Sequence, residues 1–181
     1  MKWQHKLLFL TFGIVIIGLI AGVWKEKAKI DAAPPSLLTG TLFPSSLPMP
    51  AFELQDEQTA SFTEADFQNH WTILFFGYTQ CPELCPKTLG VMAKTKQLLN
   101  PQIPVQMMLV SINPLGDTPE QLKTFFDKPD FKKAHFKGLT GEREEIQKLA
   151  GQIGVYVQET MPDFGHIEHS GSLLVINPAG D

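Results

Sequence analysis

Two mainly apolar runs occupy the middle of the chain, at 71–77 (WTILFFG) and 104–112 (PVQMMLVSI). Runs of this length are typical of strands that are covered on both faces of a sheet. The other predicted strands are shorter: 52–55 and 59–62, which form a hairpin, then 136–139, 155–158 and 172–176. Gly, Pro, Asn or Asp residues separate most of these segments, as expected for strands joined by turns and helices.

A helical turn that Thr63 can cap is predicted through Phe67, and three longer helical segments lie between the predicted strands, at 86–99, from 118 onward, and at 140–152. The second has the clearest start, because Thr118 can serve as N-cap with Pro119 at N1 and Gln121 at N3, as in a capping box. Gly154 can end the third. Strands that alternate with helices, with a closing antiparallel pair, predict an α/β fold with a thioredoxin-like (glutaredoxin/peroxiredoxin-type) sheet and flanking helices.

The N-terminal part differs from the rest. Residues 7–24 are 18 residues without a charge, which is long enough for a short membrane helix. We expect 1–31 to be a membrane anchor or signal segment, and an uncleaved anchor is favoured because no small-x-small cleavage site follows at once. Pro, Ser and Gly are frequent in 32–50, which predicts a linker, and 51–181 is the expected folded domain.

The orientation of the anchor is not decided by the lysines, which flank it on both sides. A short N-terminal tail without a folded domain favours an extracytoplasmic, periplasmic position for the domain. In such an oxidising compartment an unguarded cysteine pair tends to form a disulfide.

Composition narrows the possible functions. The chain has 181 residues, 43% of them hydrophobic, which suits one globular domain and an accessory segment. The net charge is −4 and the basic residues are scattered, so a nucleic-acid surface is not expected. With two cysteines in all, the fold cannot depend on a set of disulfides.

Those two cysteines, Cys81 and Cys85, directly follow the predicted strand 71–77. In an α/β sheet this position lies next to a helix N-terminus, whose partial positive charge favours thiolate. We therefore expect both cysteines to be more reactive than an ordinary thiol. Such a pair can bind a soft metal ion or close into a disulfide.

His169 is the candidate third ligand, because it lies just before the last predicted strand, where a loop can approach the cysteines. Two thiolates and an imidazole suit Cu(I) or Cu(II), and they also suit Zn(II). A lone histidine is more often a surface or core residue, so spacing alone does not establish the ligand.

Three motifs together resemble the SCO/SenC family of copper-binding assembly factors. The first, 77–86 followed by Thr88-Leu89, is similar to G-[FY]-T-x-C-P-[DE]-x-C-P-x-T-L. The others are 111–114 with 117–120, similar to S-[VI]-D-P-x-x-D-T-P, and 168–170, similar to [DE]-H-S. The resemblance covers about 130 residues, from Pro50 to Asp181, and the motifs occur in the family's order.

The resemblance implies a periplasmic thioredoxin-like domain that binds copper through Cys81, Cys85 and His169. Proteins of this family deliver copper to the copper centre of cytochrome c oxidase subunit II, or maintain its thiols. Other periplasmic copper chaperones and thioredoxin-like reductants are further expected partners. Two features depart from the family: Asn113 replaces a frequent Asp, and the sequence stops at Asp181, where a further strand and helix usually follow, so we expect a truncated chain.

Rival interpretations use the same residues. A membrane-anchored thiol-disulfide oxidoreductase would need the cysteine pair but not His169. A Cys2His zinc site with water as fourth ligand is the pattern of a catalytic zinc. No sequence motif places a carboxylate or a second histidine as the general base of such a site. A thiol peroxidase would need Thr or Ser at Tyr78 and Pro at Leu74. Enzymatic activity is therefore expected only in the form of thiol-disulfide exchange.

Other candidate residues have structural interpretations. Met107 and Met108 are expected in the core, and His166 is expected to face solvent or to lie behind the ligands. Met161 is expected to be a packing or surface residue rather than a weak axial ligand. Asp117 is expected to support the cap of the following helix, although the family resemblance also places its loop near the copper site.

Overall fold

The computed structural model describes residues 40–43, 45–159 and 167–181. The predicted anchor at 1–31 lies outside these ranges, as do Met161 and His166. The chain divides into residues 1–44 and a compact unit formed by 45–181, which contains all the elements described below. Within the part of the chain that the structure describes, no helix has the length and apolar character needed to cross a membrane.

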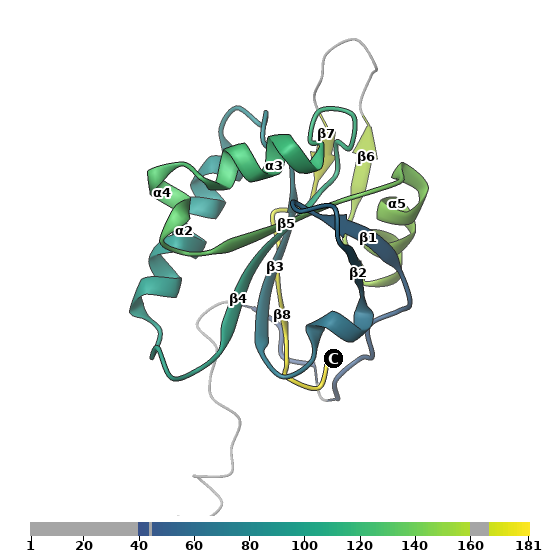
Figure 1. The fold of residues 1–181 in the computed structure, drawn as a ribbon. Helices are drawn as coiled ribbons and strands as arrows, with labels where there is room; N and C mark the ends of the chain where they lie inside the picture. Colours follow the sequence, from purple (N-terminus) through teal and green to yellow (C-terminus); the bar gives the residue numbers. More distant parts are fainter. Residues whose placement is uncertain (1–39, 44, 160–166) are drawn as a thin grey trace, which may run out of the picture. The chain divides into compact units, whose positions relative to one another are not determined.

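The compact unit is a mixed α/β structure (Figure 1). Its strands are β1 (Glu53–Asp56), β2 (Ser61–Thr63), β3 (Trp71–Gly77), β4 (Val105–Ser111), β5 (Phe136–Thr140), β6 (Val157–Glu159), β7 (Ile167–His169) and β8 (Leu173–Ile176). Its helices are the 3-10 turn η1 (Glu64–Phe67) and α2 (Leu84–Leu98), α3 (Pro119–Phe126), α4 (Pro129–Lys132) and α5 (Arg143–Gln152). Six strands form one sheet in the order β2-β1-β5-β4-β3-β8, and β6 pairs with β7 in a separate two-stranded sheet.

The centre of the main sheet is parallel. β3 pairs with β4 from Trp71↔Val105 to Gly77↔Ser111, and β4 pairs with β5 in the same sense. β8 runs antiparallel to β3. Both β3 and β4 are almost entirely buried, as their continuous apolar sequences predicted.

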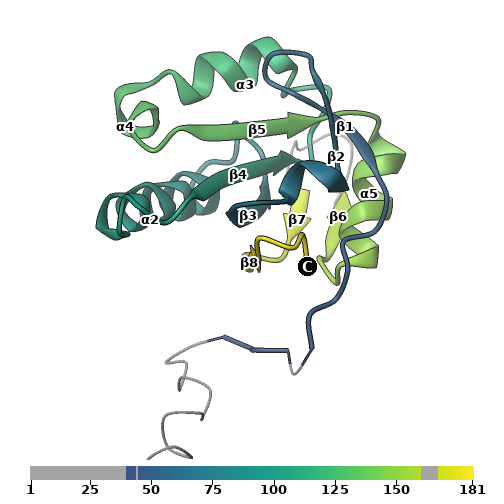
Figure 2. The same cartoon turned by 60° about the horizontal axis from the view of Figure 1, so that its bottom comes forward.

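Helices α2 and α3 cover one face of this sheet. A Cβ on Gly77 of β3 would contact Cys85 of α2, and a Cβ on Gly138 of β5 would contact Leu122 of α3. The strand register places these two glycines on the same face. Gly138 lies beside Leu109, and Leu109 lies beside Phe75. Gly77 is two residues after Phe75 in β3 and so points to the same side of the sheet. In Figure 2, α4 joins this layer at the end of α3, whereas α5 lies apart, beside β1 and β6.

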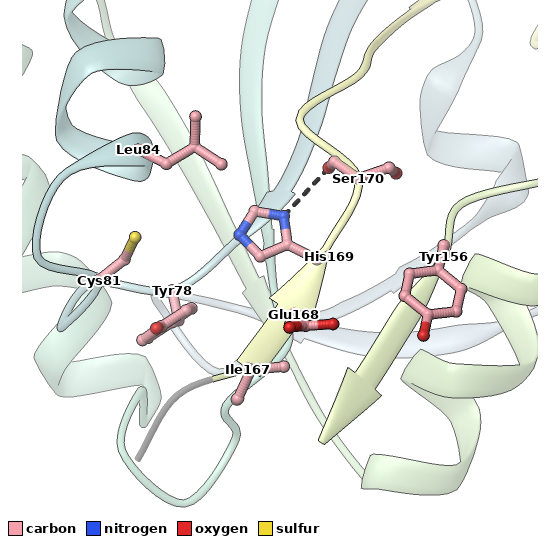
Figure 3. A pocket seen from close by; sticks show the side chains of 8 residues that line it. All are labelled: Tyr78, Cys81, Leu84, Tyr156, Ile167, Glu168, His169 and Ser170. Carbon is pink, nitrogen blue, oxygen red and sulfur yellow. Dashed lines mark hydrogen bonds between the residues drawn. The ribbon is translucent and has the colours of Figure 1, made fainter. Parts of the chain in front are cut away.

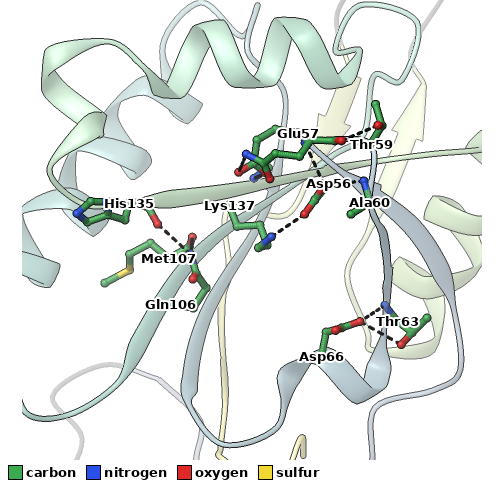
Figure 4. A network of polar contacts seen from close by, with 12 residues as sticks. Asp56, Glu57, Thr59, Ala60, Thr63, Asp66, Gln106, Met107, His135 and Lys137 are labelled. Carbon is green, nitrogen blue, oxygen red and sulfur yellow. Dashed lines mark hydrogen bonds and ion pairs between the residues drawn. The ribbon is translucent and has the colours of Figure 1, made fainter.

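A polar network ties the N-terminal hairpin to β5 (Figure 4). The carboxylate of Asp56 accepts hydrogen bonds from the backbone N–H groups of Gln58 and Ala60, each at 2.9 Å. Its other oxygen lies 2.8 Å from Nζ of Lys137. The tight turn and the ion pair therefore share one largely buried carboxylate, which fixes β1 beside β5.

The predicted strands are all present, but several boundaries and one position differ. α2 begins at Leu84, two residues before the predicted Pro86, so Cys85 lies in the helix. α5 begins at Arg143 rather than Thr140, because Thr140 still belongs to β5 and pairs with Gln55. β6 lies outside the main sheet, and the short elements α4 and β7 were not predicted.

Candidate metal centre

Cys81 and Cys85 lie at the junction of β3 and α2, both as free thiols. Cys81 is in the connecting loop and is 9% exposed, whereas Cys85, in the first turn of α2, is fully buried. The backbone N–H of Cys85 donates to Sγ of Cys81 at 3.4 Å. The first turn of the helix therefore brings the two side chains to one end of the sheet.

His169 meets the cysteines from β7. Its Nε2 lies 3.6 Å from Sγ of Cys85, and its Nδ1 lies 3.0 Å from the carbonyl oxygen of Ser170. Because a carbonyl only accepts, Nδ1 donates this hydrogen bond, and Nε2 is the ring nitrogen that faces the sulfur. The sequence placed this histidine in a loop, but it is the last residue of a strand.

The β6–β7 sheet and two aromatic rings hold His169 in place. His169 pairs with Val157, and the next residue, Ser170, donates its N–H to the carbonyl of Tyr156 at 3.0 Å. The imidazole packs edge-on against Phe75 and Tyr78, with ring centroids 5.7 and 6.3 Å away. Backbone pairing and ring packing thus restrict the direction in which Nε2 points.

The two thiols differ in acidity. Burial alone would raise the pKa of Cys81. Hydrogen bonds from the backbone amides of Glu83, Leu84 and Cys85, and from the Cys85 thiol, outweigh burial and lower this pKa below 9.0. Burial raises the pKa of Cys85 to about 12, and the negative charges of Cys81 and Asp117 add to the rise. The expectation of two activated thiols was therefore correct for Cys81 and wrong for Cys85, because the helix N-terminus does not offset the loss of water around a fully buried sulfur.

Asp117 contacts the cysteine loop at Thr79, near the site where the resemblance placed it, and the helix cap forms without its side chain. Its fully buried carboxylate accepts hydrogen bonds from the backbone N–H of Thr79 at 3.0 Å, from the Thr79 hydroxyl, and from Oγ of Ser111 at 2.6 Å. It therefore joins the loop after β3 to the end of β4. Thr118 forms the predicted capping box without it. Because the capping box is complete without Asp117, an acidic residue directly before it was the sequence signal that could have indicated another structural role.

The other candidate residues have structural roles. Asn113 accepts at Oδ1 from the N–H of Gly116 at 3.3 Å and so shapes the loop after β4. Glu83, between the cysteines, forms an ion pair with Lys87 in which both side chains are largely exposed. Met107 and Met108 are fully buried, which confirms that they belong to the core.

A pocket of about 300 Å³ opens beside the thiols (Figure 3). Its lining residues are Tyr78, Cys81, Leu84, Tyr156, Ile167, Glu168, His169 and Ser170. In Figure 3 the imidazole of His169 points toward the loop that carries Cys81. Two of the three predicted ligands therefore belong to the wall of this pocket, and the buried Cys85 lies behind it.

The donor atoms are suited to a soft metal ion. Bonds of ~2.3 Å to sulfur and ~2.0 Å to nitrogen, as zinc makes, place those two atoms ~3.5–3.7 Å apart at a common metal. The distance between Cys85 Sγ and His169 Nε2 is 3.6 Å, which fits this range. Within residues 40–43, 45–159 and 167–181, however, no group of three or more His, Cys, Asp or Glu side chains is arranged to hold a metal ion. The three-ligand site therefore stays a prediction.

Comparison with known proteins gives a consistent result. The model of the SCO1/SenC family matches residues 44–181. A protein from Stutzerimonas stutzeri that is named for copper binding is 36% identical over 148 residues, which are 77% of this chain and 69% of that protein. The mitochondrial SCO2 homologue of Danio rerio is 30% identical over 71% of this chain but only 47% of its own length. The chain thus spans about half of that curated relative.

Solved structures share the fold. The copper-bound structure of ScoI from Bradyrhizobium japonicum has a TM-score of 0.66 and 26% identity, with 74% of this chain and 85% of that chain covered. BsSco, described as a member of the Sco family of cytochrome c oxidase assembly proteins, has a TM-score of 0.60 at 22% identity, with 74% and 78% covered. At that identity BsSco supports the fold alone. The predicted thioredoxin-like α/β sheet with flanking helices is confirmed.

Proposed function

The chain belongs to the SCO1/SenC family, and we propose that it is a copper-binding assembly factor whose ligands are Cys81, Cys85 and His169. The observation that carries the proposal is the approach of His169 Nε2 to Cys85 Sγ at 3.6 Å, next to the second thiol. Two sulfurs and one imidazole nitrogen form a donor set that favours copper, above all Cu(I).

Each ligand has a separate role in binding. Cys81, with its lowered pKa and its place in the pocket wall, offers the first thiolate to an incoming ion. Cys85 must lose a proton that its surroundings hold firmly, so binding releases that proton and the affinity rises with pH. His169 offers Nε2, because its Nδ1 donates to the Ser170 carbonyl and Nε2 faces the Cys85 sulfur.

We further propose that copper is cargo for the copper centre of cytochrome c oxidase subunit II. Support comes from the family resemblance of the three motifs and from the copper-binding relatives. The same proposal includes the N-terminal anchor at 1–31, a periplasmic position for the domain, and exchange with other copper chaperones or thioredoxin-like reductants.

Copper titration of the reduced full chain tests the proposal. We expect about one equivalent to bind tightly, and we expect a Cu(II) complex with visible thiolate charge-transfer absorption. His169→Ala should lose tight binding, whereas His70→Ala should not. His70 is a suitable control because it precedes Trp71 at the opposite end of β3 from the cysteines. Unchanged affinity in His169→Ala would contradict the three-ligand site.

The unequal acidity of the two thiols favours a second function, thiol-disulfide exchange. The Cys81 thiolate would attack a disulfide of the partner to form a mixed disulfide. Cys85, after losing its proton, would then attack Cys81 Sγ, and the partner would leave as a dithiol while this pair becomes a disulfide. Two electrons pass to the partner, whose thiols are thereby maintained. His169→Ala should keep this activity, which separates it from copper binding.

A further inference from the structure

A second pocket, of about 800 Å³, shares no wall residue with the pocket beside Cys81. Its walls come from the β1–β2 hairpin, from the start of α3, and from the end of β5 together with the beginning of α5. β1 and α5 lie side by side in Figure 1 and Figure 2. A pocket of this size is large enough for a small molecule or for several side chains of another protein.

The antiparallel register of β1 and β5 continues beyond the ladder into this pocket. Gln55 of β1 lies opposite Thr140 of β5. The next residues of the two segments are also neighbours, because a Cβ on Gly141 would lie 3.6 Å from the Cα of Leu54. The register therefore holds for one residue past the last backbone pair.

One step further in this register, Glu53 lies opposite Glu142, and both line the pocket. The backbone of Glu142 is extended, with φ −65° and ψ 137°, so its side chain is on the same side as that of Thr140. Like charges at opposite positions of an antiparallel pair are destabilising. A cation bound between these two carboxylates removes the repulsion.

The other charged groups leave the pocket acidic. Its third carboxylate, Glu145, already pairs at 3.3 Å with Lys148, the one basic side chain in the lining. Glu53 accepts a hydrogen bond from Oγ of Ser61 at 3.1 Å, and Glu142 precedes α5 without capping it. Among the described residues, neither Glu53 nor Glu142 forms an ion pair. Charge complementarity therefore favours a cationic ligand.

The hydroxyl of Thr140 is an independent sign of a ligand. Thr140 lines the pocket and is only 4% exposed. Its Oγ1 is buried and has no hydrogen-bond partner in the part of the chain that the structure describes. Buried hydroxyl groups are normally hydrogen-bonded, because an unpartnered one loses its bonds to water without replacement. A ligand that donates N–H groups supplies the missing partner.

We propose that this pocket binds a segment of another polypeptide through an arginine side chain, with the guanidinium among Glu53, Glu142 and the Thr140 hydroxyl. A guanidinium carries several N–H donors in a fixed planar fork, which suits acceptors that come from different elements. Pro114 and Pro119 in the wall suit the apolar stem of the arginine. Because one side chain does not fill about 800 Å³, residues next to the arginine also enter the pocket.

Isothermal titration calorimetry on the full, metal-free chain tests the proposal with two peptides. One is Ala-Ser-Arg-Ser-Ala, and the other has citrulline, the neutral analogue of arginine, in the middle. We expect saturable binding of the arginine peptide and about tenfold weaker binding of the citrulline peptide. Equal affinities, or a Kd above about 1 mM for the arginine peptide, would overturn the proposal. Free arginine that binds as tightly as the peptide would show that the ligand is not a polypeptide.

Substitutions identify the groups that bind the guanidinium. Glu53→Gln and Glu142→Gln should each weaken binding of the arginine peptide about fivefold to tenfold and leave the citrulline peptide unaffected. Thr140→Val should also weaken binding, yet it should raise the midpoint of urea unfolding, because it removes an unpartnered buried hydroxyl. A hydroxyl with a purely structural role would lower that midpoint.

Glu144→Gln is the matched control, because Glu144 is in the same first turn of α5 but does not line the pocket. It should bind the arginine peptide as the wild-type protein does. Wild-type affinity in both Glu142→Gln and Thr140→Val, or an equal loss in Glu144→Gln, would contradict the proposed site.

Discussion

The sulfur of Cys85 lies 3.6 Å from Nε2 of His169, although 84 residues separate the two in the sequence. The cysteine comes from the first turn of α2 and the histidine from the last residue of β7. Neither element alone positions both groups. The site therefore depends on contact between the β3–α2 junction and the small β6–β7 sheet, and a change at this contact should affect copper binding before it affects the rest of the fold.

Gly77 offers the most direct way to test that dependence. A Cβ at this position would lie 2.6 Å from Cε1 of Phe75 and 2.9 Å from Sγ of Cys85. Gly77→Ala should therefore displace the sulfur and the ring that packs on His169, at a cost of about 1–3 kcal/mol for overpacking. We expect copper affinity, measured by competition with a chelator, to fall together with the midpoint of urea unfolding.

Gly90→Ala is the control, because a Cβ at Gly90 in α2 meets nothing within 4 Å. Replacement of a helical glycine by alanine should stabilise the protein by about 0.5–1 kcal/mol. Copper affinity should not change. Normal copper affinity in Gly77→Ala would show that the sulfur is not held where the structure places it.

The unequal thiols predict an order of alkylation in the metal-free, reduced protein. The lowered pKa of Cys81 supplies more thiolate at pH 8 than an ordinary cysteine does. With a pKa of about 12, Cys85 has about one thiolate in ten thousand molecules at the same pH, and its sulfur is buried. Iodoacetamide followed by peptide mass spectrometry should therefore label Cys81 first. Equal labelling of the native protein would contradict this assignment, and equal labelling after denaturation is the control.

Asp117 should stabilise both the fold and the cysteine loop. The carboxylate of Asp117 accepts three hydrogen bonds, two from Thr79 and one from Ser111. Asp117→Asn replaces one of its oxygens with an NH2 group, which cannot accept any of them. We expect a loss of about 1.5–3 kcal/mol, as for hydrogen bonds to a charged group, in urea unfolding. Asp127→Asn, which affects an exposed pair with Lys132, should cost less than about 1 kcal/mol. Equal effects of the two substitutions would argue against the role of Asp117 at the loop.

Sequence patterns predicted the sheet well because they reflect local physics. The continuous apolar runs at 71–77 and 104–112 became β3 and β4, and Thr118 caps α3 as its spacing to Gln121 predicted. Gly154 has φ +76°, which explains why it can end α5. In each case the deciding interactions lie within a few residues, so the pattern contains them.

Long-range contacts account for what the sequence could not predict. The high pKa of Cys85 comes from burial beneath the sheet end and from the charge of Asp117, which is distant in sequence. β7 forms because Ile167–His169 pairs with β6, although the segment has only three residues. The carboxylate of Asp117 was assigned to a helix cap because its partner Thr79 is 38 residues away.

The ion pair between Asp56 and Lys137 predicts how stability depends on acid. Burial works to raise the pKa of Asp56, but hydrogen bonds from Lys137 and from two backbone amides lower it below 3.8. Because the folded state holds the charged carboxylate more firmly than the unfolded chain does, this contribution is complete above pH 3.8 and is lost as the pH falls below it. The side chains of Asp56 and Lys137 are only 9% and 28% exposed, so solvent screens the pair weakly.

Lys137→Met should therefore reduce the free energy of unfolding at pH 7 by about 1.5–3 kcal/mol, the contribution of a hydrogen bond to a charged group. It should also move acid unfolding, followed by circular dichroism, to higher pH, because Asp56 then takes up a proton more readily. Lys148→Met removes a longer pair with Glu145, whose side chains are 51% and 37% exposed, and should change stability by less than about 1 kcal/mol. If Lys137→Met left the acid transition unchanged, the hairpin would be held to β5 by its backbone pairing, and the buried carboxylate would serve only the turn at Gln58 and Ala60.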